Sequence, residues 1–309
     1  MSIRRTLSKI SRRVMSSDSD HKSATLDADP LAAQPQKAWD QRKVVQTAAK
    51  VEPVPFDKEK PPGHIRFVCV SDTHSRSDRM GTIPDGDVLL HAGDFTDLGH
   101  LQKVKDFNTW LGTLPHPHKV VIAGNHDLTF DPKLMQEIRA GRRPMFWAVR
   151  DEEAEMAKSL LTNCIYLEDS ETNVMGIRIW GSPWQPWFYD WAFNKERGKP
   201  ILEKWNLIPE GVDILVTHGP PLGHGDVTIT GQHVGCVDLL NTIQKRVKPK
   251  YHIFGHIHEG YGITTDGTTT YVNASVCTVR YQPVNPPIVF DLPTPEEAMK
   301  QLAKELDLD

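Results

Sequence analysis

The chain has 309 residues, of which 39% are hydrophobic and 25% are charged, as in a globular protein with a sizeable core. No uninterrupted apolar stretch approaches the roughly 20 residues of a membrane-spanning helix, and a net charge of -4 gives no general attraction to nucleic acid. We therefore expect no membrane span and no nucleic-acid polymer as partner. The four cysteines form no Cys-x-x-Cys pair, which indicates reduced thiols in an intracellular protein.

Residues 1 to 55 differ in composition from the rest of the chain. They are rich in Ser, Ala, Lys and Arg and show little strand patterning, which predicts a mobile N-terminal tail and linker. In the first fifteen residues, basic side chains occur without any acidic one, and apolar residues recur at helical spacing. Two interpretations remain open: a disordered basic arm of a cytoplasmic protein, or a transit peptide for mitochondria.

The folded domain is expected to span residues 56 to 293. Its first half contains apolar runs that stop at small or polar residues and so predict buried strands. These runs span residues 65–70, 88–92 and 119–123. A helical apolar pattern separates the last two runs, and this β-α-β alternation predicts parallel strands whose carboxyl ends share one edge of the sheet, where ligands commonly bind.

The next elements repeat the alternation. Helices are predicted from Asp131, an N-cap followed by proline, to Gly141, and from Asp151 to about Thr162. Further strands are predicted at residues 213–216 and 252–254, with a helix between them.

The last strands of the domain are expected to pair antiparallel. Asp266 and Gly267 predict a hairpin turn, and residues 288–291 predict the last strand. Residues 294–309 predict a short C-terminal helix that begins with a capping box and packs its apolar face onto the domain.

A set of chemically similar residues follows the predicted strands. Asp72 and His74, like His256 and His258, are two apart on extended segments, so each pair can reach into one site. Each pair alone is weak evidence, but the complete set in order, each member after a strand, is not expected by chance. The set offers only oxygen and imidazole ligands: Asp72, His74, Asp94, Asn125, His126, His218, His256 and His258.

This set resembles the pattern of the calcineurin-like metallophosphoesterases: Asp-x-His, Gly-Asp, Gly-Asn-His-Asp/Glu, a His after a strand, and Gly-His-x-His. The resemblance covers about residues 63 to 293. The contexts SDTHSR, HAGDFTDLG and FGHIHEGYG are most similar to the metallophosphoesterase domain-containing proteins of animals, which resemble class III cyclic-nucleotide phosphodiesterases. The resemblance implies an α/β fold: a layered β-sheet sandwich flanked by helices, with βαβ units and a mixed or antiparallel end.

The resemblance also implies two divalent metal ions. It assigns the first ion to Asp72, His74, Asp94 and His258, and the second to Asp94, Asn125, His218 and His256. Asp94 would then bridge the ions, and His126 would remain unligated and act on the leaving group. Imidazole and oxygen donors without a thiolate favour Mn²⁺, with Mg²⁺, Co²⁺, Fe and Zn²⁺ as alternatives.

The chemistry of such a site predicts the function. Two divalent ions roughly 3.5 to 4 Å apart can clamp an in-line phosphoryl displacement and acidify a bridging water into the attacking hydroxide. We expect hydrolysis of a small-molecule phosphodiester or nucleotide, above all a cyclic nucleotide. Asp97 is not followed by the Arg of related protein phosphatases, which argues against that activity. The alternative is a nucleotide-binding or scaffolding protein with little turnover, and the oligomeric state stays open.

Several residues near the predicted site have two possible roles. Asp127 could orient the imidazole of His126 or cap the next helix, and the aromatic segment 184–191 could stack a nucleobase or cover the sheet edge. His224 could reach the substrate or lie on the surface, and residues 273–275 are expected to shape the backbone near the site. The remaining histidines are expected to be structural, for example His91, His116, His118 and His252.

Overall fold

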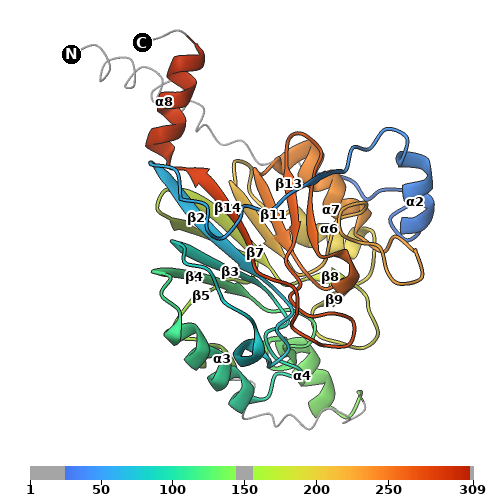
Figure 1. Ribbon diagram of the computed structural model, residues 1–309. Coiled ribbons are helices and arrows are strands. Elements are labelled where there is room, and N and C mark those ends of the chain that lie inside the picture. Colours follow the sequence, from blue (N-terminus) through green and yellow to red (C-terminus); the bar gives the residue numbers. More distant parts are fainter. Residues whose placement is uncertain (1–24, 144–155, 307–309) are drawn as a thin grey trace.

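The computed structural model describes residues 25–143 and 156–306. Two β-sheets stack face to face, and helices cover their outer faces (Figure 1). This arrangement confirms the expected α/β fold with a layered sandwich. Within the described ranges, no helix combines the length and hydropathy that a membrane crossing requires.

The first sheet has five strands. In spatial order they are β14 (Ile288–Pro293), β2 (His64–Val70), β3 (Val88–Ala92), β4 (His118–Ile122) and β5 (Ile165–Tyr166). β14 is antiparallel to β2, and the other neighbours are parallel, as the β-α-β pattern predicted. The outer face is covered by α3 (Leu101–Thr113) and α4 (Pro132–Arg139) (Figure 1).

The second sheet has seven strands. In spatial order they are β1 (Ala49–Val51), β12 (Gly262–Thr265), β13 (Thr270–Asn273), β11 (Tyr251–Phe254), β10 (Ile214–Thr217), β7 (Ile177–Ser182) and β6 (Ser170–Val174). The four strands from β13 to β7 are parallel, whereas β12 and β6 pair antiparallel with their neighbours. Its outer face packs against α6 (Lys199–Trp205) and α7 (Val237–Thr242), and a π-helical turn, Ile243–Val247, continues α7.

Alternation along the strands explains the two sides of the first sheet. Phe67 and Cys69 of β2 point into the core between the sheets, whereas Val68 and Val70 point toward the helices. Both faces are therefore buried, which is why apolar residues occupy successive positions from Phe67 to Val70 instead of alternating with polar ones. A separate ribbon pairs β8 (Gln185–Pro186) with β9 (Asn194–Lys195).

The N-terminal part that the structure describes differs from the expected mobile tail. Residues 25–55 contain α2 (Pro35–Arg42), and β1 pairs antiparallel with β12 and forms the edge of the seven-stranded sheet. Trp39 stacks on His233 at 4.2 Å between ring centroids, and Ala38 is completely buried. The segment is ordered by contacts with distant residues, which its own polar composition does not indicate. The basic segment 1–15 lies outside the described residues, so its role stays a prediction.

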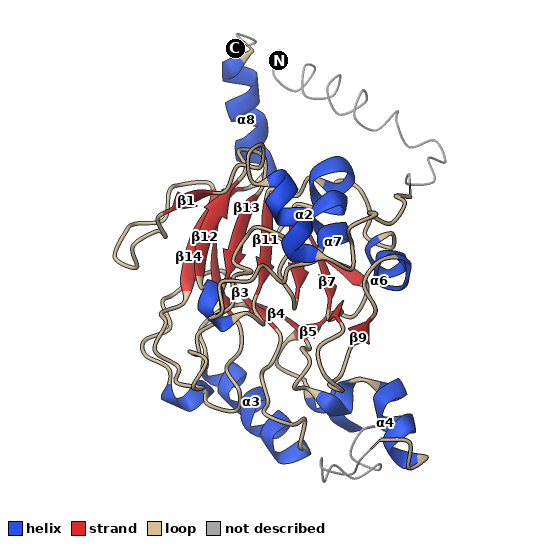
Figure 2. Ribbon diagram, turned by 90° about the vertical axis from the view of Figure 1, so that its right-hand side faces the viewer, coloured by secondary structure: helices blue, strands red, loops and turns tan. Residues whose placement is uncertain are grey.

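The C-terminal helix α8 (Pro295–Glu305) begins as predicted, because the Thr294 hydroxyl accepts a hydrogen bond from the backbone N of Glu297 at 3.3 Å. The expected packing of its apolar face onto the domain is not seen along its last turns. Leu302 and Leu306 are 47% and 56% exposed. In both views α8 extends beyond the ends of the strands (Figures 1 and 2).

Two other predicted helices can be compared with the structure. Asp131 caps α4, since its carboxylate accepts from the backbone N of Lys133 and Leu134. Of the helix expected from Asp151 to Thr162, residues 151–155 lie outside the described ranges, and the rest includes a 3₁₀ turn at Lys158–Leu160.

Candidate metal centre

All eight predicted site residues lie just beyond the carboxyl ends of parallel strands. The five-stranded sheet contributes them after β2, β3 and β4, and the seven-stranded sheet after β10 and β11. The centre therefore lies where the edges of the two stacked sheets meet. Contacts between the two sets, described below, bring the eight residues into one site.

The backbone around the centre is strained. Asp72, His74, Asp94 and His256 all have left-handed backbones, with φ between 43° and 66°. Such conformations cost free energy in non-glycine residues and concentrate at functional sites. Space is also tight: a Cβ atom on Gly124 would lie 2.3 Å from Oδ1 of Asp94, so only glycine fits there.

The first ligand group consists of Asp72, His74 and His258, whose ligand atoms all lie within 4.8 Å of one another. Nε2 of His258 is 3.4 Å from Oδ1 of Asp72 and 3.2 Å from Nε2 of His74. Nδ1 of His258 donates to the carbonyl of Thr278 at 3.0 Å. The lone pair of Nε2 consequently points toward the other two ligands.

The second group consists of Asp94, His218 and His256, again within 4.8 Å. Nε2 of His218 lies 3.3 Å from Oδ2 of Asp94 and 2.9 Å from Oδ1 of Asn125. Nδ1 of His218 donates to the carbonyl of Ala92 at 2.9 Å, which directs Nε2 inward. The same Oδ2 of Asp94 is 3.8 Å from Nε2 of His74, so this carboxylate lies between the two groups.

The charges of the centre fit cations. Asp72 and Asp94 are almost completely buried, and no Lys or Arg among the described residues forms an ion pair with either. Burial opposes ionisation of Asp94, but the surrounding imidazoles, His218 first, hold its pKa well below the usual value. Burial also disfavours protonation of His218, yet the charge of Asp94 raises its pKa to about 9. Buried carboxylates with imidazole and amide donors fit divalent ions.

His126 lies beside these groups. Its Nδ1 donates to the carbonyl of Asp97 at 2.8 Å, and its ring lies 4.0 Å from that of Trp191. A ligand atom of His126 is also within 4.8 Å of those of His74 and Asp94. Distance alone therefore allows both a ligand role and the predicted role at the leaving group.

Asp127 has neither of the two roles considered from the sequence. Its carboxylate accepts from Thr96 N at 2.9 Å, Thr96 Oγ1 at 2.7 Å and Gly124 N at 2.8 Å. Burial, followed by the charge of Asp94, raises the pKa of Asp127 to about 7. Asp127 ties the loop after β3 to the loop after β4.

Two contributors were missed by sequence reasoning. Ser275 donates from Oγ to Oδ2 of Asp72 at 2.7 Å, although only a backbone role was expected for residues 273–275. The ring of Tyr281 lies 4.7 Å from that of His74. A lone tyrosine in a loop carries no signal that would single it out.

The aromatic segment 184–191 divides into a packed part and an exposed part, and its expected stacking on a nucleobase stays a prediction. Trp184 is partly buried, and Lys195 and Lys204 contact its ring face at 4.7 and 4.4 Å. Phe188 instead is 40% exposed, and its ring lies 5.2 Å from that of His256. Trp184 therefore packs against the core, whereas Phe188 lies beside the metal centre.

Two other histidines of the described ranges have contacts in the core. His224 is buried and stacks on Tyr271 at 3.7 Å between ring centroids, so it is not a surface residue. Nε2 of the buried His91 forms a hydrogen bond with Oγ1 of Thr73 at 3.0 Å, in agreement with its expected structural role.

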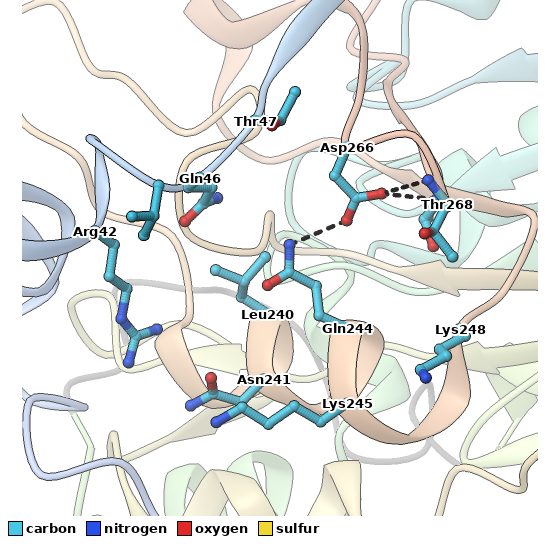
Figure 3. A pocket seen from close by; sticks show the side chains of 12 residues that line it. Arg42, Gln46, Thr47, Leu240, Asn241, Gln244, Lys245, Lys248, Asp266 and Thr268 are labelled. Atoms are coloured by element: carbon cyan, nitrogen blue, oxygen red, sulfur yellow. Dashed lines mark hydrogen bonds between the residues drawn. The ribbon is translucent and has the colours of Figure 1, made fainter.

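A hollow of about 570 Å³ lies between the chain after α2, the helical turns of α7 and the β12–β13 turn (Figure 3). It shares no residue with the metal centre. Asp266, the one carboxylate of its lining, already accepts hydrogen bonds from Gln244 and Thr268 (Figure 3). The hollow therefore lacks a set of metal ligands.

A family model described as Calcineurin-like phosphoesterase matches residues 65–260. Because the match spans more than half of the chain, the chain belongs to the calcineurin-like phosphoesterase family. This membership supports hydrolysis of phosphoric esters with divalent metal ions.

Curated relatives refine this placement. Human Metallophosphoesterase domain-containing protein 1 is 65% identical over 252 residues, which cover 80% of this chain and 77% of that protein. The mouse protein of the same name matches equally. A UPF0046 protein of Caenorhabditis elegans is 48% identical over 268 residues, covering 84% of this chain and 68% of that protein. The predicted closeness to these animal proteins is thereby confirmed.

Proposed function

We propose that this protein is a binuclear metal-dependent phosphodiesterase that hydrolyses a small-molecule phosphodiester, with cyclic nucleotides as the substrate class. The observation that carries the proposal is the pair of ligand groups that meet at Asp94, whose Oδ2 is 3.3 Å from His218 Nε2 and 3.8 Å from His74 Nε2. A carboxylate between two sets of ligands is suited to bridge two ions.

The residues divide into two coordination sets. One ion would be held by Asp72, His74, Asp94 and His258, and the other by Asp94, Asn125, His218 and His256. When bound, the ions would polarise the phosphoryl oxygens and lower the pKa of a water molecule. We propose Mn²⁺, because the donors are imidazole and oxygen without thiolate. Asn125 adds an oxygen without adding charge, so the ions keep a positive field for phosphate.

His126 is proposed to donate a proton to the leaving oxygen. Its Nδ1 is occupied by the Asp97 carbonyl at 2.8 Å, so Nε2 is the nitrogen available to the substrate. The ring of Trp191, 4.0 Å away, holds the imidazole in place. A positioned imidazole of this kind typically contributes about 10²- to 10⁴-fold to the rate.

The experiment that tests the proposal compares two carboxylate variants. The wild-type protein should bind close to two Mn²⁺ ions and hydrolyse bis(4-nitrophenyl) phosphate, and Asp94→Asn should lose both properties. Asp291→Asn is the control, because Asp291 pairs with Arg66 at 2.9 Å and has no contact with the centre. Hydrolysis that persists in Asp94→Asn would rule out this mechanism.

The substrate class needs a separate assay. Cyclic nucleotides, dinucleotides and phosphomonoesters should be compared in Mn²⁺, and the cyclic nucleotides should give the highest kcat/KM. A protein that serves only to bind nucleotide would instead release a tightly held nucleotide on denaturation and show no turnover after its removal.

A further inference from the structure

Two exposed aromatic side chains border the metal centre. The ring of Tyr281 lies 4.7 Å from that of His74 and 5.8 Å from that of His258, and the ring of Phe188 lies 5.2 Å from that of His256. Tyr281 is 39% exposed and Phe188 is 40% exposed. Each ring therefore offers open aromatic surface next to a proposed metal ligand, and exposed apolar groups at such a site indicate binding.

The loop that carries Tyr281 is tied to the centre at both ends. The carbonyl of Thr278 accepts from Nδ1 of His258 at 3.0 Å, and Asn285 donates from Nδ2 to the carbonyl of Ser275 at 3.0 Å. Tyr281 has a φ of 56°, which is unusual for a bulky side chain. The guanidinium carbon of Arg76 lies 5.6 Å above its ring. These contacts set the position of the ring before any ligand binds.

Phe188 is held in a comparable way. Its backbone N donates to Oδ1 of Asn194 at 3.1 Å, and Nδ2 of Asn194 donates to the carbonyl of Tyr189 at 2.8 Å. Tyr189 itself has a φ of 46°. Two loops that are far apart in sequence thus use defined hydrogen bonds and left-handed residues to hold rings that remain exposed. Burial of the rings cannot be the reason for this construction.

We propose that Tyr281 and Phe188 form an aromatic subsite that binds a planar ring attached to the phosphate of the substrate. This inference rests on the proposed function, which places the phosphate at the metal centre. Stacking on an aromatic face accepts any planar ring, so a nucleobase and a phenyl group share the required chemistry. Among the described residues, the Tyr281 hydroxyl has no hydrogen-bond partner, so it is available to the polar edge of a bound ring.

The test replaces the two aromatic side chains and leaves the proposed metal ligands unchanged. Tyr281→Leu and Phe188→Leu are compared with Val284→Ala, a control in the Tyr281 loop at a side chain that is 64% exposed. Substrates are adenosine 3′,5′-cyclic phosphate and methyl riboside 3′,5′-cyclic phosphate, which lacks the base. For the adenosine ester, each Leu variant should lower kcat/KM by about tenfold, as expected for a lost stacking contact. The base-free ester, the Val284→Ala control and the Mn²⁺ content should be unaffected.

An equal loss with both esters, or no loss with either, overturns the subsite. If the wild-type protein hydrolyses neither ester, the proposed function fails, and calorimetric binding then tests the subsite independently. Tighter binding of adenosine 5′-monophosphate than of ribose 5-phosphate, lost in the Leu variants, supports it, and equal binding of the two refutes it.

Two further comparisons define the ligand. Phenyl phosphate is compared with methyl phosphate in the same binding assay. A preference for phenyl phosphate that Tyr281→Leu abolishes identifies a subsite for any planar ring, whereas a loss confined to the adenosine compound identifies a nucleobase subsite. Tyr281→Phe keeps the ring and removes the hydroxyl, so it should retain the preference for a ring-bearing ligand; loss of that preference would contradict stacking as its basis.

Discussion

Ser275 donates a 2.7 Å hydrogen bond to Asp72, although the two residues are 203 positions apart in the chain. Asp72 also accepts from the backbone N of His256 at 3.1 Å through each oxygen. The carboxylate is therefore oriented from the far end of the chain before any ion binds. Such outer contacts commonly determine how well a metal ligand performs.

Replacement of Ser275 by Ala should weaken Mn²⁺ binding by about 10- to 100-fold, because Asp72 loses the hydroxyl that orients it. Titration of the metal-free protein with Mn²⁺ measures the change. Ser182→Ala is the matched control: Ser182 is also buried and donates to a carboxylate, that of Asp169, at 2.8 Å. If both variants bind Mn²⁺ as the wild type does, Ser275 has only a structural role.

His126→Ala should retain both metal ions and lose turnover by roughly 10²-fold or more, because the proton donor to the leaving group is removed. Metal content and kcat are measured on the same preparation. Because a ligand atom of His126 lies within 4.8 Å of those of His74 and Asp94, the metal content of the variant distinguishes a proton donor from a metal ligand. A variant with fewer bound ions would show that His126 is a ligand.

Mn²⁺ binding at pH 7.5 should release protons. In the metal-free protein, Asp94 raises the pKa of His218 above its ordinary value of 6.5 to about 9 despite burial, and a metal ligand must be neutral. Calorimetry in buffers of different ionisation enthalpy measures the release, and the apparent affinity should rise with pH up to about 9.

The stability of the metal-free protein should also depend on pH through the protonation of His218. Because the folded-state pKa of His218 is raised, its protonation stabilises the metal-free fold below about pH 6.5, and this contribution is lost as the pH rises through about 9. Stabilisation by Mn²⁺ should therefore increase with pH over this range. If Mn²⁺ binding released no proton at pH 7.5, that result would contradict a raised pKa of His218 in the metal-free protein.

Asp127→Asn should lower the free energy of unfolding by about 1 to 3 kcal/mol, because the new amide group would face backbone N–H donors that now have a carboxylate acceptor. Denaturant unfolding measures this loss. Asp106→Asn should cost less, because the Asp106 side chain is 54% exposed and its hydrogen bond from Gln102 joins two side chains at the surface. Equal stability of Asp127→Asn and the wild type would show that the link between the loops is unimportant.

The sequence by itself determined which segments form the site-bearing strands and which residue types follow them. Apolar runs that stop at Asp72, Asp94 and Asn125 predicted parallel strands, and chain direction alone then brings their carboxyl ends to one edge. These features are local, because a strand period and the residue that follows it lie within a few positions of each other. The residues at the strand ends carry the family resemblance, and that resemblance implied the layered α/β fold.

Only the tertiary structure decided which distant groups surround that edge. The contact of Ser275 with Asp72, the place of Tyr281 above His74 and the pairing of β1 with β12 all join segments that no local period relates. The role of Asp127 could not be predicted from its local sequence either, because its hydrogen-bond partner Thr96 lies in the loop after another strand. Side-chain contacts of this kind depend on how two sheets pack, and that packing is a property of the whole core rather than of any one segment.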